Sequence, residues 1–573
     1  MNVCGIKILF RRSSKINSIF KYLIKEWKHI MKIFSNLKIL IPYIKNSKRY
    51  FIWGLLGIIF VSAIVAPVPY LIGKVLDIVL EKNVTFFDIR GILIFLLLIY
   101  FTKFFVNIIY QYLFAKLQQN VVNEIRLSMF ERLIDAPLSF INKREKGYIL
   151  SRIGEVQQIG AVFSPTIITS FVGIFEIIFC LIMMLSINVK LSIVALIIIP
   201  VYFVISQVIS LKITQNTIKM QEDSAKLSAD VFETLNGIEQ IKILNGRKIQ
   251  LNKIYSKSKT LIKSAIRQNL SIASFMQGIS FASDLITVGI LALAGYLIIN
   301  KEITVGVYTA FSLYIGKILV VTQSVGTFEM TIKPVCATIE RIKEFLFLRS
   351  ENNANANSLN ESICEIRFEN VSFGYDDNNL FLKNVTQKFV EGDGVLLLGE
   401  NGSGKTTFIK LLAGLYEPIE GKILFNGKDF LQLDKYDIRS KIGIVSQDIF
   451  LFRGSVIDNI LFGVSGKNEK DVWELLKKYG LVSYIDRFPN GLDTEILQNG
   501  VGVSGGQAQI IAFIRSIITK KDILILDEAT SNLDQEACQK IISILRDNRL
   551  CRILIIISHQ QFEYEFINKI IRF

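Results

Sequence analysis

The stretch Val395-Leu-Leu-Leu-Gly-Glu-Asn-Gly-Ser-Gly-Lys-Thr-Thr407 joins a short apolar run to a glycine-rich loop. Residues 395–398 predict a buried strand, and a helix-like run at 408–415 follows the loop. In this context the glycines let backbone amides curl around phosphate groups, while Lys405 reaches the β- and γ-phosphates and Thr406 offers its hydroxyl to Mg²⁺. The residues expected to hold a nucleotide are Gly399, Glu400, Asn401, Gly402, Ser403, Gly404, Lys405, Thr406 and Thr407.

A second motif, Ile523-Leu-Ile-Leu-Asp-Glu528, is an apolar run that ends in two acids. Asp527 lies 122 residues after Lys405 in the chain. We expect Asp527 to bind the Mg²⁺ and Glu528 to polarise the attacking water, as in-line phosphoryl transfer requires. The alternative, in which the two acids only begin a loop, is disfavoured once a phosphate loop is present.

Composition and charge exclude several classes of protein. The chain has 573 residues, 51% of them hydrophobic, and a formal charge of +16, so it is not a disordered polar chain. Six cysteines without a CxxC pair and only two histidines give no indication of a disulfide scaffold or a zinc cluster. The net charge is +11 over residues 1–50, +10 over 51–350 and −5 over 351–573, so the most soluble third is acidic and nucleic-acid binding is disfavoured.

Long apolar runs predict a membrane domain. Phe51 to Gly73 is 23 residues without a charge, which is long enough to cross a hydrocarbon core of ~30 Å as a helix. The long connectors 115–159 and 212–267 are rich in Lys and Arg, as is the N-terminus. The positive-inside bias therefore predicts that these segments, and everything after the last span, face the cytoplasm. The six predicted spans lie near 51–73, 92–114, 160–184, 191–211, 268–299 and 303–328.

The predicted fold class is a multidomain membrane protein with an all-α six-helix transmembrane domain, long cytoplasmic helical extensions and a following α/β P-loop ATPase domain. Residues 116–134 and 218–243 have helical apolar spacing and no proline, which predicts helices that leave the membrane. The first 50 residues are expected to lie on the anionic inner leaflet, with a targeting peptide as the alternative. The predicted parts are 1–50, the transmembrane domain 51–328, a connecting helix and Asn-rich linker 329–362, and the nucleotide-binding domain 363–573.

Several further motifs carry a family resemblance. Val503-Ser-Gly-Gly-Gln507 resembles the signature sequence of ATP-binding cassette (ABC) transporters. Stretches 130–140 with 147–152 and 233–242 resemble the first and second cytoplasmic loops of the exporter branch. The resemblance extends from about residue 35 onward, as a half-transporter. The remaining family motifs occur in the family's order as Phe373-Gly-Tyr375, Val445-Ser-Gln447, Ser531-Asn-Leu-Asp534 and Ile557-Ser-His559.

The resemblance implies a role for each matching residue. It implies that Tyr375 stacks on adenine, that Thr406, Gln447 and Asp527 hold Mg²⁺, and that Glu528 and His559 are catalytic. A satisfied structural histidine at a strand end is the alternative for His559. Asp534 would belong to the D-loop. The residues expected to bind the ATP of a partner subunit are Ser504, Gly505, Gly506 and Gln507.

The resemblance also implies that two chains pair, because each chain has one phosphate loop and one signature. The presence of both Glu528 and His559 favours a homodimer, and a heterodimer remains an alternative. The sequence departs from the family pattern at Val503 and Asn532. It ends at Phe573, 14 residues after His559, so we expect the family's usual final strand turn and C-terminal helix to be missing or vestigial.

Four charged residues interrupt otherwise apolar spans, namely Lys103, Glu176, Asp284 and Lys317. Such groups tend to face a cavity or one another, so they are candidates either for a substrate cavity or for structural pairs. The sequence therefore predicts an ATP-driven exporter that moves an amphipathic or hydrophobic substrate, such as a peptide, lipid or drug. The expected cofactors are ATP and Mg²⁺, and the expected partners are a second half-transporter, membrane lipid and the substrate. A lipid-linked flippase and a non-transport regulator are the alternatives.

Overall fold

The computed structural model describes residues 35–81, 85–144, 146–352, 356–375, 379–400, 402–497, 502–547, 550–558 and 565–573. Most of the predicted N-terminal basic segment, Asn401 and His559 lie outside the described residues. The chain divides into two compact units. We call Met1–Phe130 with Gly147–Phe347 the helical unit, and Glu131–Lys146 with Leu348–Phe573 the α/β unit.

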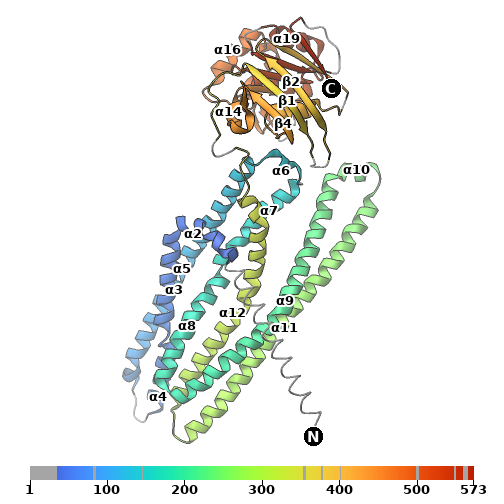
Figure 1. The fold of residues 1–573 in the computed structure, drawn as a ribbon. Helices are drawn as coiled ribbons and strands as arrows, with labels where there is room; N and C mark the ends of the chain where they lie inside the picture. The colour runs from blue at the N-terminus through green and yellow to red at the C-terminus, as the bar shows by residue number, and fades with distance from the viewer. Residues whose placement is uncertain are drawn as a thin grey trace, which may run out of the picture. The chain divides into compact units, whose positions relative to one another are not determined.

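The helical unit consists of long helices joined by short turns (Figure 1). Three of these helices, α5, α9 and α11, contain 49, 48 and 53 residues, which corresponds to roughly 70–80 Å each at 1.5 Å per residue. A hydrocarbon core of ~30 Å cannot contain them, so each extends well beyond it. The helices are η1 (Lys38–Leu40), α2 (Ile41–Asn46), α3 (Lys48–Val65), α4 (Val68–Leu80), α5 (Phe86–Ile134), α7 (Lys146–Ile159), η2 (Gly160–Phe163), α8 (Pro165–Ile187), α9 (Val189–Asn236), α10 (Ile238–Ile243), α11 (Arg247–Ile299) and α12 (Val305–Leu346).

Four helical stretches of the described residues are long and apolar enough to cross a membrane: Lys48–Leu80, Phe86–Ile134, Arg247–Ile299 and Val305–Thr322. Val172–Ile187 in α8 is a shorter apolar helix. The side chains at 194–212 in α9 lie outside the description, so the predicted span at 191–211 and the total of six remain predictions. Pro67 separates α3 from α4, since proline cannot donate the backbone hydrogen bond that a continuous helix needs.

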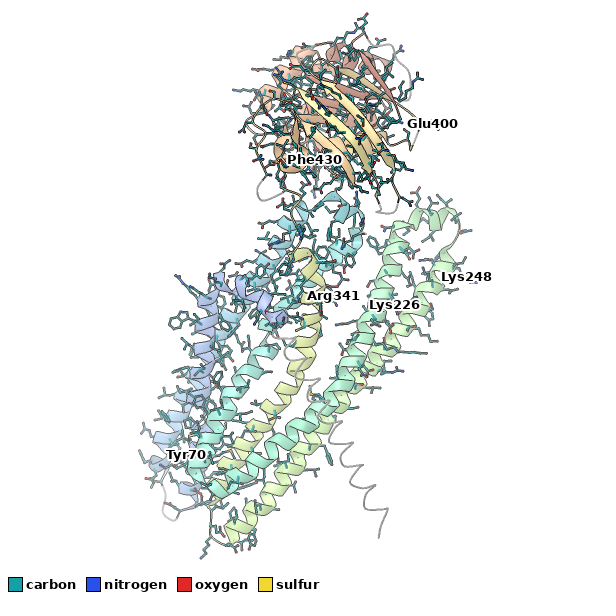
Figure 2. All side chains as sticks on the ribbon, in the orientation of Figure 1. Tyr70, Lys226, Lys248, Arg341, Glu400 and Phe430 are labelled. Carbon is teal, nitrogen blue, oxygen red and sulfur yellow. The ribbon has the colours of Figure 1, made fainter. Side chains whose placement is uncertain are left out.

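The helices α9 and α11 run side by side and are joined by α10 (Figure 1). Lys226 lies on α9 and Lys248 lies near the start of α11 (Figure 2). At the α10 end of this pair Lys253 forms ion pairs with Asp230 at 3.4 Å and with Glu233 at 3.0 Å. Charged, exposed side chains here are stable in water and not in lipid, so the predicted helical extensions are present as continuations of the long helices.

A close contact of two glycines joins α4 to α12. Gly73 and Gly306 approach so closely that a Cβ atom on either would overlap the carbonyl oxygen of the other. The Asp77 carboxylate accepts hydrogen bonds of 2.7 Å from the Gly306 amide and the Thr304 hydroxyl. Thr304 is the N-cap of α12, so Asp77 both satisfies the start of this helix and fixes α4 against it.

In the described residues the α/β unit contains two large sheets and the two-stranded sheet β7-β8. Its five-stranded parallel sheet has the order β11-β3-β10-β9-β6, and its four-stranded antiparallel sheet has the order β2-β1-β4-β5. The strands are β1 (Glu365–Phe373), β2 (Leu382–Val390), β3 (Gly394–Leu398), β4 (Glu420–Phe425), β5 (Lys428–Asp429), β6 (Ile442–Val445), β7 (Gly454–Ser455), β8 (Glu495–Ile496), β9 (Ile523–Asp527), β10 (Ile553–Ile557) and β11 (Lys569–Arg572). The helices are α6 (Leu138–Asn142), α13 (Lys405–Leu412), η3 (Phe430–Gln432), α14 (Lys435–Ser440), α15 (Val456–Ile460), α16 (Glu469–Tyr479), α17 (Val482–Ile485), η4 (Gly491–Asp493), α18 (Gly505–Ile517) and α19 (Gln535–Leu545).

Alternate residues of each parallel strand pack on opposite faces of the sheet. In β9, Leu524 and Leu526 join one hydrophobic core, which includes residues of α15 to α19. Ile523 and Ile525 join a second core, which includes α13 and the antiparallel sheet. This two-residue period explains why the central strands are apolar throughout. The predicted fold class is confirmed as a helical part followed by an α/β part, while the number of six spans remains a prediction.

Two features of the α/β unit differ from the sequence-based expectations. The expectation of a missing or vestigial chain end contrasts with the presence of β11, which pairs in parallel with β3, and the Phe573 amide donates to the Leu398 carbonyl oxygen. The polar segment 351–362 is also more than a connector. Leu359 is buried in the core of the α/β unit, and Asn357 forms a β-bridge with Leu433. Which residues of a polar segment pack or pair with a folded surface depends on the tertiary structure, and an Asn-rich composition does not indicate it.

The contact of α4 with α12 predicts that Gly306→Ala destabilises the helical unit. The added methyl group would meet backbone and the Asp77 carboxylate, which cannot move cheaply, at a cost of about 1–3 kcal/mol. The temperature of thermal unfolding of the purified protein should fall. Gly91→Ala in α5 is the matched control, since nothing lies within 4 Å of its added Cβ and alanine favours a helix. Equal unfolding temperatures for the two variants would contradict the predicted clash.

Candidate nucleotide site

The phosphate loop connects β3 to α13, as expected from its sequence. Gly402 and Gly404 have φ angles of 83° and 108°, a region that side chains other than glycine rarely adopt. A Cβ atom at Gly404 would also lie 2.5 Å from Leu382 Cδ2. Position 404 therefore requires glycine, both because its φ angle is positive and because a side chain would clash with Leu382.

Within the loop, Lys405 is buried and its Nζ donates to the carbonyl oxygens of Gly399 at 2.6 Å and Glu400 at 2.9 Å. The Ser403 hydroxyl is buried and has no hydrogen-bond partner among the described residues. A buried hydroxyl without a partner is costly, and a phosphate oxygen would satisfy it. The first amides of α13 add the positive end of a helix dipole, so the loop fits an anionic phosphate chain.

The two acids lie at the end of β9, which pairs with β10 and β6. Asp527 is buried, and this burial raises the pKa of its carboxyl group. The neighbouring Glu528 charge raises this pKa further, whereas Lys405 lowers it. Glu528 has a φ of 52°, an unusual conformation for a residue with a side chain. The Glu528 Oε2 atom accepts a hydrogen bond of 2.9 Å from Gln447 Nε2, so the structure brings together two residues that are 81 positions apart.

The expected Mg²⁺ ligands Thr406 and Gln447 come from segments that follow β3 and β6, and Asp527 is the last residue of β9. Parallel strands have their carboxyl ends at one edge of the sheet, so these three positions lie there. The donor set is oxygen only, which Mg²⁺ prefers. Among the described residues no group of three or more His, Cys, Asp or Glu side chains forms a metal cage. The residues therefore fit a Mg²⁺ ion that also binds substrate phosphates and water.

Tyr375 offers an exposed aromatic ring beside the phosphate loop. Its side chain is 43% exposed, and its hydroxyl shares a hydrogen bond of 2.9 Å with Thr407 Oγ1 in α13. The ring also contacts Phe373, Phe381 and Tyr416. A supported but exposed ring at this position can stack on a nucleotide base.

The signature residues lie at the start of α18. Ser504 is the N-cap, and it exchanges hydrogen bonds with Gln507 in a capping box: the Gln507 amide donates to Ser504 Oγ at 3.3 Å and the Ser504 amide donates to Gln507 Oε1 at 2.9 Å. Gly505 and Gly506 pack against Asn532 of the D-loop, where a Cβ atom at 506 would lie 2.9 Å from the Asn532 carbonyl oxygen. Among the described residues, the signature glycines thus contact the D-loop of the same chain.

Asp534 has a structural contribution that its motif does not reveal. It is the N-cap of α19 and accepts a hydrogen bond of 2.7 Å from the Ala537 amide. It also pairs with Arg487 at 3.2 Å. The backbone hydrogen bond and then Arg487 hold the pKa of the Asp534 carboxyl below its usual range, so this carboxylate stays charged.

Sequence reasoning did not assign Gln509 to the site. This side chain is 1% exposed, and its Nε2 atom donates to Ser531 Oγ at 3.3 Å and to the Glu528 carbonyl oxygen at 3.5 Å. Its Oε1 atom accepts from the Asn532 amide at 3.2 Å. Gln509 thereby joins the signature helix to the turn that carries Glu528. A polar residue among the apolar positions 508–514 was the available signal, because buried amides need partners.

Two of the other intramembrane charges influence Lys317 electrostatically. Lys317 of α12 lies within electrostatic range of Glu176 of α8 and Lys103 of α5. Its Nζ atom also lies 3.5 Å from the Val65 carbonyl oxygen. Asp284 lies on α11 with an exposed side chain and is not part of this group. Charges on α5 and α8 thus act electrostatically on Lys317 of α12, whereas Asp284 is not among the charges that do so.

The chain matches two family models in succession. Residues 51–323 match the model described as ABC transporter transmembrane region, and residues 382–531 match the model described as ABC transporter. The chain is 30% identical to the alpha-hemolysin translocation ATP-binding protein HlyB of Escherichia coli O157:H7 over 80% of this chain and 65% of that protein. It is 27% identical to the ATP-dependent lipid A-core flippase of Desulfotalea psychrophila over 88% of this chain and 89% of that protein.

Among solved structures, the chain is similar to a bacterial Atm1-family ABC exporter with ATP bound. The TM-score is 0.79, the sequence identity is 23%, and the similarity covers 90% of this chain and 91% of that chain. At this identity the likeness establishes the fold.

The buried amide of Gln509 predicts that Gln509→Leu lowers the maximal rate of ATP hydrolysis about tenfold. The leucine would leave the Asn532 amide without its acceptor and would loosen the turn at Glu528, a loss of about 1–3 kcal/mol. Because no atom of Gln509 is expected to touch the nucleotide, the KM for ATP should change little. Steady-state kinetics of the purified protein separate the two constants, and a change in KM with an unaltered kcat would contradict this role.

Proposed function

Because this chain belongs to the ABC transporter family, we propose that it is one half of an ATP-driven exporter that moves an amphipathic or hydrophobic substrate across a membrane. The observation that carries the proposal is the pairing of Gln447 with Glu528 at the edge of the sheet where the phosphate loop also lies. This arrangement supports a site for hydrolysis of ATP, and a regulator without turnover would not need it. The long apolar helices in the same chain connect that hydrolysis to a membrane.

In the proposed reaction, the phosphate loop and Lys405 hold the triphosphate while Glu528 orients the attacking water. Lys405 exchanges its carbonyl partners for phosphate oxygens, which are stronger acceptors because they are charged. Gln447 keeps the Glu528 carboxylate in position through its amide. Bound Mg²⁺ would neutralise charge that develops on the phosphate oxygens. Tyr375 would stack on adenine, and His559 is proposed as a second catalytic residue.

Half-transporters of this family act as pairs of chains, and we propose that the partner here is a second copy. Each chain has one phosphate loop and one signature helix, whose free N-terminal amides suit the γ-phosphate of an ATP held by the other copy. Ser504, Gly505, Gly506 and Gln507 would make that contact. Glu528 and His559 are both present in the sequence, so two equal sites can form. A heterodimer is the alternative.

The proposed location is a bacterial inner membrane, with the nucleotide-binding domain (363–573) and the N-terminal segment (1–50) in the cytoplasm. The uneven distribution of Lys and Arg supports this orientation of the transmembrane domain (51–328). The similarity to HlyB supports a peptide as substrate, and the similarity to the lipid A-core flippase over 89% of its length supports a lipid. A flippase is therefore the second candidate.

The proposed role of Glu528 predicts that Glu528→Gln lowers steady-state ATP hydrolysis at least about a hundredfold, because an amide cannot accept a proton from the attacking water. Binding of ATP should persist, since the phosphate loop is unchanged. Glu420→Gln, at an exposed position at the start of β4, is the matched control and should hydrolyse ATP at the normal rate. Unchanged turnover of Glu528→Gln would exclude Glu528 as the catalytic carboxylate.

The group Lys103, Glu176 and Lys317 predicts that its members affect stimulation of ATP hydrolysis by amphiphiles. Two positive charges and one negative charge favour an anionic amphiphile. Stimulation by an anionic lysolipid should therefore fall in Lys317→Met and in Lys103→Met. Asp284→Asn is the matched control, as Asp284 is exposed and is not among the charges that influence Lys317. If all the variants respond as the unmodified protein does, the three charges have a structural role only.

A further inference from the structure

Tyr416 lies between the aromatic ring of Tyr375 and the helix α6 within the α/β unit. It belongs to the loop 413–417, which follows α13, and its side chain is 6% exposed. Its ring meets the edge of Tyr375 at a centroid distance of 5.5 Å and an angle of 88°, and it contacts Phe373 at 5.2 Å. Tyr416 therefore supports the ring that is proposed to stack on adenine.

On its other side Tyr416 contacts α6, a helix far away in sequence. Its hydroxyl accepts a hydrogen bond of 2.8 Å from Asn142 Nδ2, across 274 positions of the chain. The neighbouring Leu138 of α6 packs against the core of the α/β unit. The segment 131–146 is one of the two places where the chain passes between the units. Asn142 of this segment thus forms a hydrogen bond with Tyr416, the residue that supports Tyr375.

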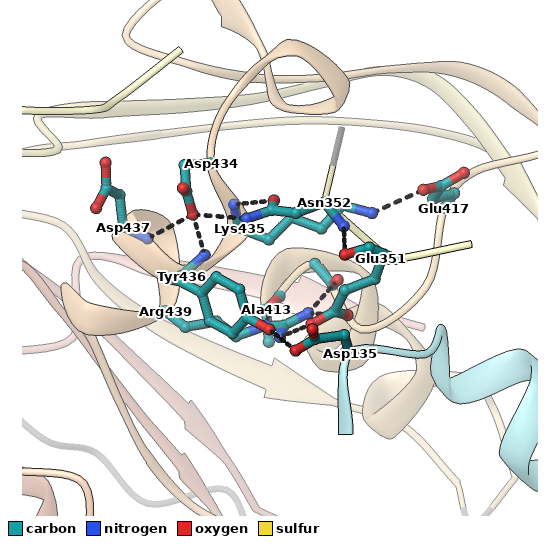
Figure 3. Close-up of polar contacts among 12 residues, drawn as sticks. Asp135, Glu351, Asn352, Ala413, Glu417, Asp434, Lys435, Tyr436, Asp437 and Arg439 are labelled. Carbon is teal, nitrogen blue, oxygen red and sulfur yellow. Dashed lines mark hydrogen bonds and ion pairs between the residues drawn. The ribbon is translucent and has the colours of Figure 1, made fainter. Parts of the chain in front are cut away.

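The segment that begins at Leu348, where the chain enters the α/β unit a second time, also stabilises the loop 413–417. Figure 3 shows Glu351 and Arg439 joined by two hydrogen bonds, of 2.5 and 2.8 Å. Arg439 in turn donates to the carbonyl oxygens of Ala413 and Gly414, at 3.2 and 2.8 Å. Lys435 adds an ion pair of 2.7 Å with Glu417. The loop is therefore fixed on both sides of Tyr416, so its ring has little freedom to shift independently.

We propose that Tyr416 is a positioning residue for the nucleotide base: its hydrogen bond with Asn142 sets the orientation of Tyr375, so that the segment 138–142 tunes the affinity for adenine. This inference rests on the proposed function, in which Tyr375 stacks on the base. The contact with Thr407 fixes only the hydroxyl end of Tyr375, so the angle of its ring depends on the aromatic side chains around it. Stacking is sensitive to that angle.

The test is equilibrium binding of ATP and of inorganic tripolyphosphate to the purified full chain, in EDTA so that no ATP is hydrolysed. Tripolyphosphate has no base, so it reports on the phosphate loop alone. Tyr416→Phe keeps the ring but removes the hydroxyl, and Asn142→Leu removes the donor at nearly constant size. Each should weaken ATP binding about three- to tenfold, while tripolyphosphate binding stays within about twofold. In Asn142→Asp the Tyr416 hydroxyl can donate to the carboxylate, so affinity should be largely restored.

A matched control removes a different hydrogen bond of the same segment. The Tyr436 hydroxyl donates to Asp135 Oδ1 at 2.8 Å, and this bond raises the pKa of Tyr436 to about 12, so the hydroxyl remains a donor (Figure 3). Tyr436 is not among the aromatic contacts of Tyr375. Tyr436→Phe should therefore leave the ratio of the two affinities unchanged.

The outcomes separate this inference from the proposed function. If Tyr375→Leu weakens ATP binding but Tyr416→Phe and Asn142→Leu leave the ratio of the two affinities unaltered, the role of Tyr416 is wrong. A parallel loss of ATP and tripolyphosphate binding in these variants would also overturn it, because it would indicate damage to the fold. If Tyr375→Leu itself leaves ATP binding unaltered, the stacking role in the proposed function fails, and the inference fails with it.

Discussion

The strands of the parallel sheet in the α/β unit all have their carboxyl ends at one edge of the sheet, and the nucleotide site depends on this arrangement. The phosphate loop follows β3, Gln447 follows β6, and Asp527 ends β9. The strands themselves are apolar on both faces and are buried between two cores, which keeps them rigid. Burial of Asp527 raises the pKa of its carboxyl group, which is a cost of this arrangement, and a cation bound at the same edge would offset it. The strands that form the buried centre of the α/β unit therefore also position the residues of the nucleotide site.

The turn after β9 shows how a strained position is maintained. Glu528 has a positive φ, which costs of the order of 1–3 kcal/mol, and the surrounding contacts must hold it. Gln509 supplies one of them from α18, and Gln447 binds the carboxylate. The signature helix and the Glu528 turn are thus one connected structure. In a pair of chains, this would join the ATP bound by a partner to the chain's own catalytic residue.

The helical unit obeys a different constraint, since lipid cannot satisfy backbone groups. Its helices are continuous for up to 53 residues, and their charged ends lie on the stretches that exceed the hydrocarbon thickness. Where two helices approach closely, as at Gly73 and Gly306, small residues permit the contact. Lys103 and Glu176 influence Lys317 electrostatically, which fits the high cost of an isolated charge in a lipid environment.

The sequence by itself determined the fold class, the phosphate loop, the β9 acids and the long helices. These features depend on local spacing: four apolar residues before a glycine loop, or an uncharged run of 23 residues, have few physical solutions. Only the tertiary structure decided that Gln509 supports Glu528, that Asn142 reaches Tyr416, that segment 351–362 packs on the domain, and that Asp284 is not among the charges that influence Lys317. Each of these depends on which distant residues a folded backbone brings within hydrogen-bond distance, and the spacing of residues along a chain carries no record of that.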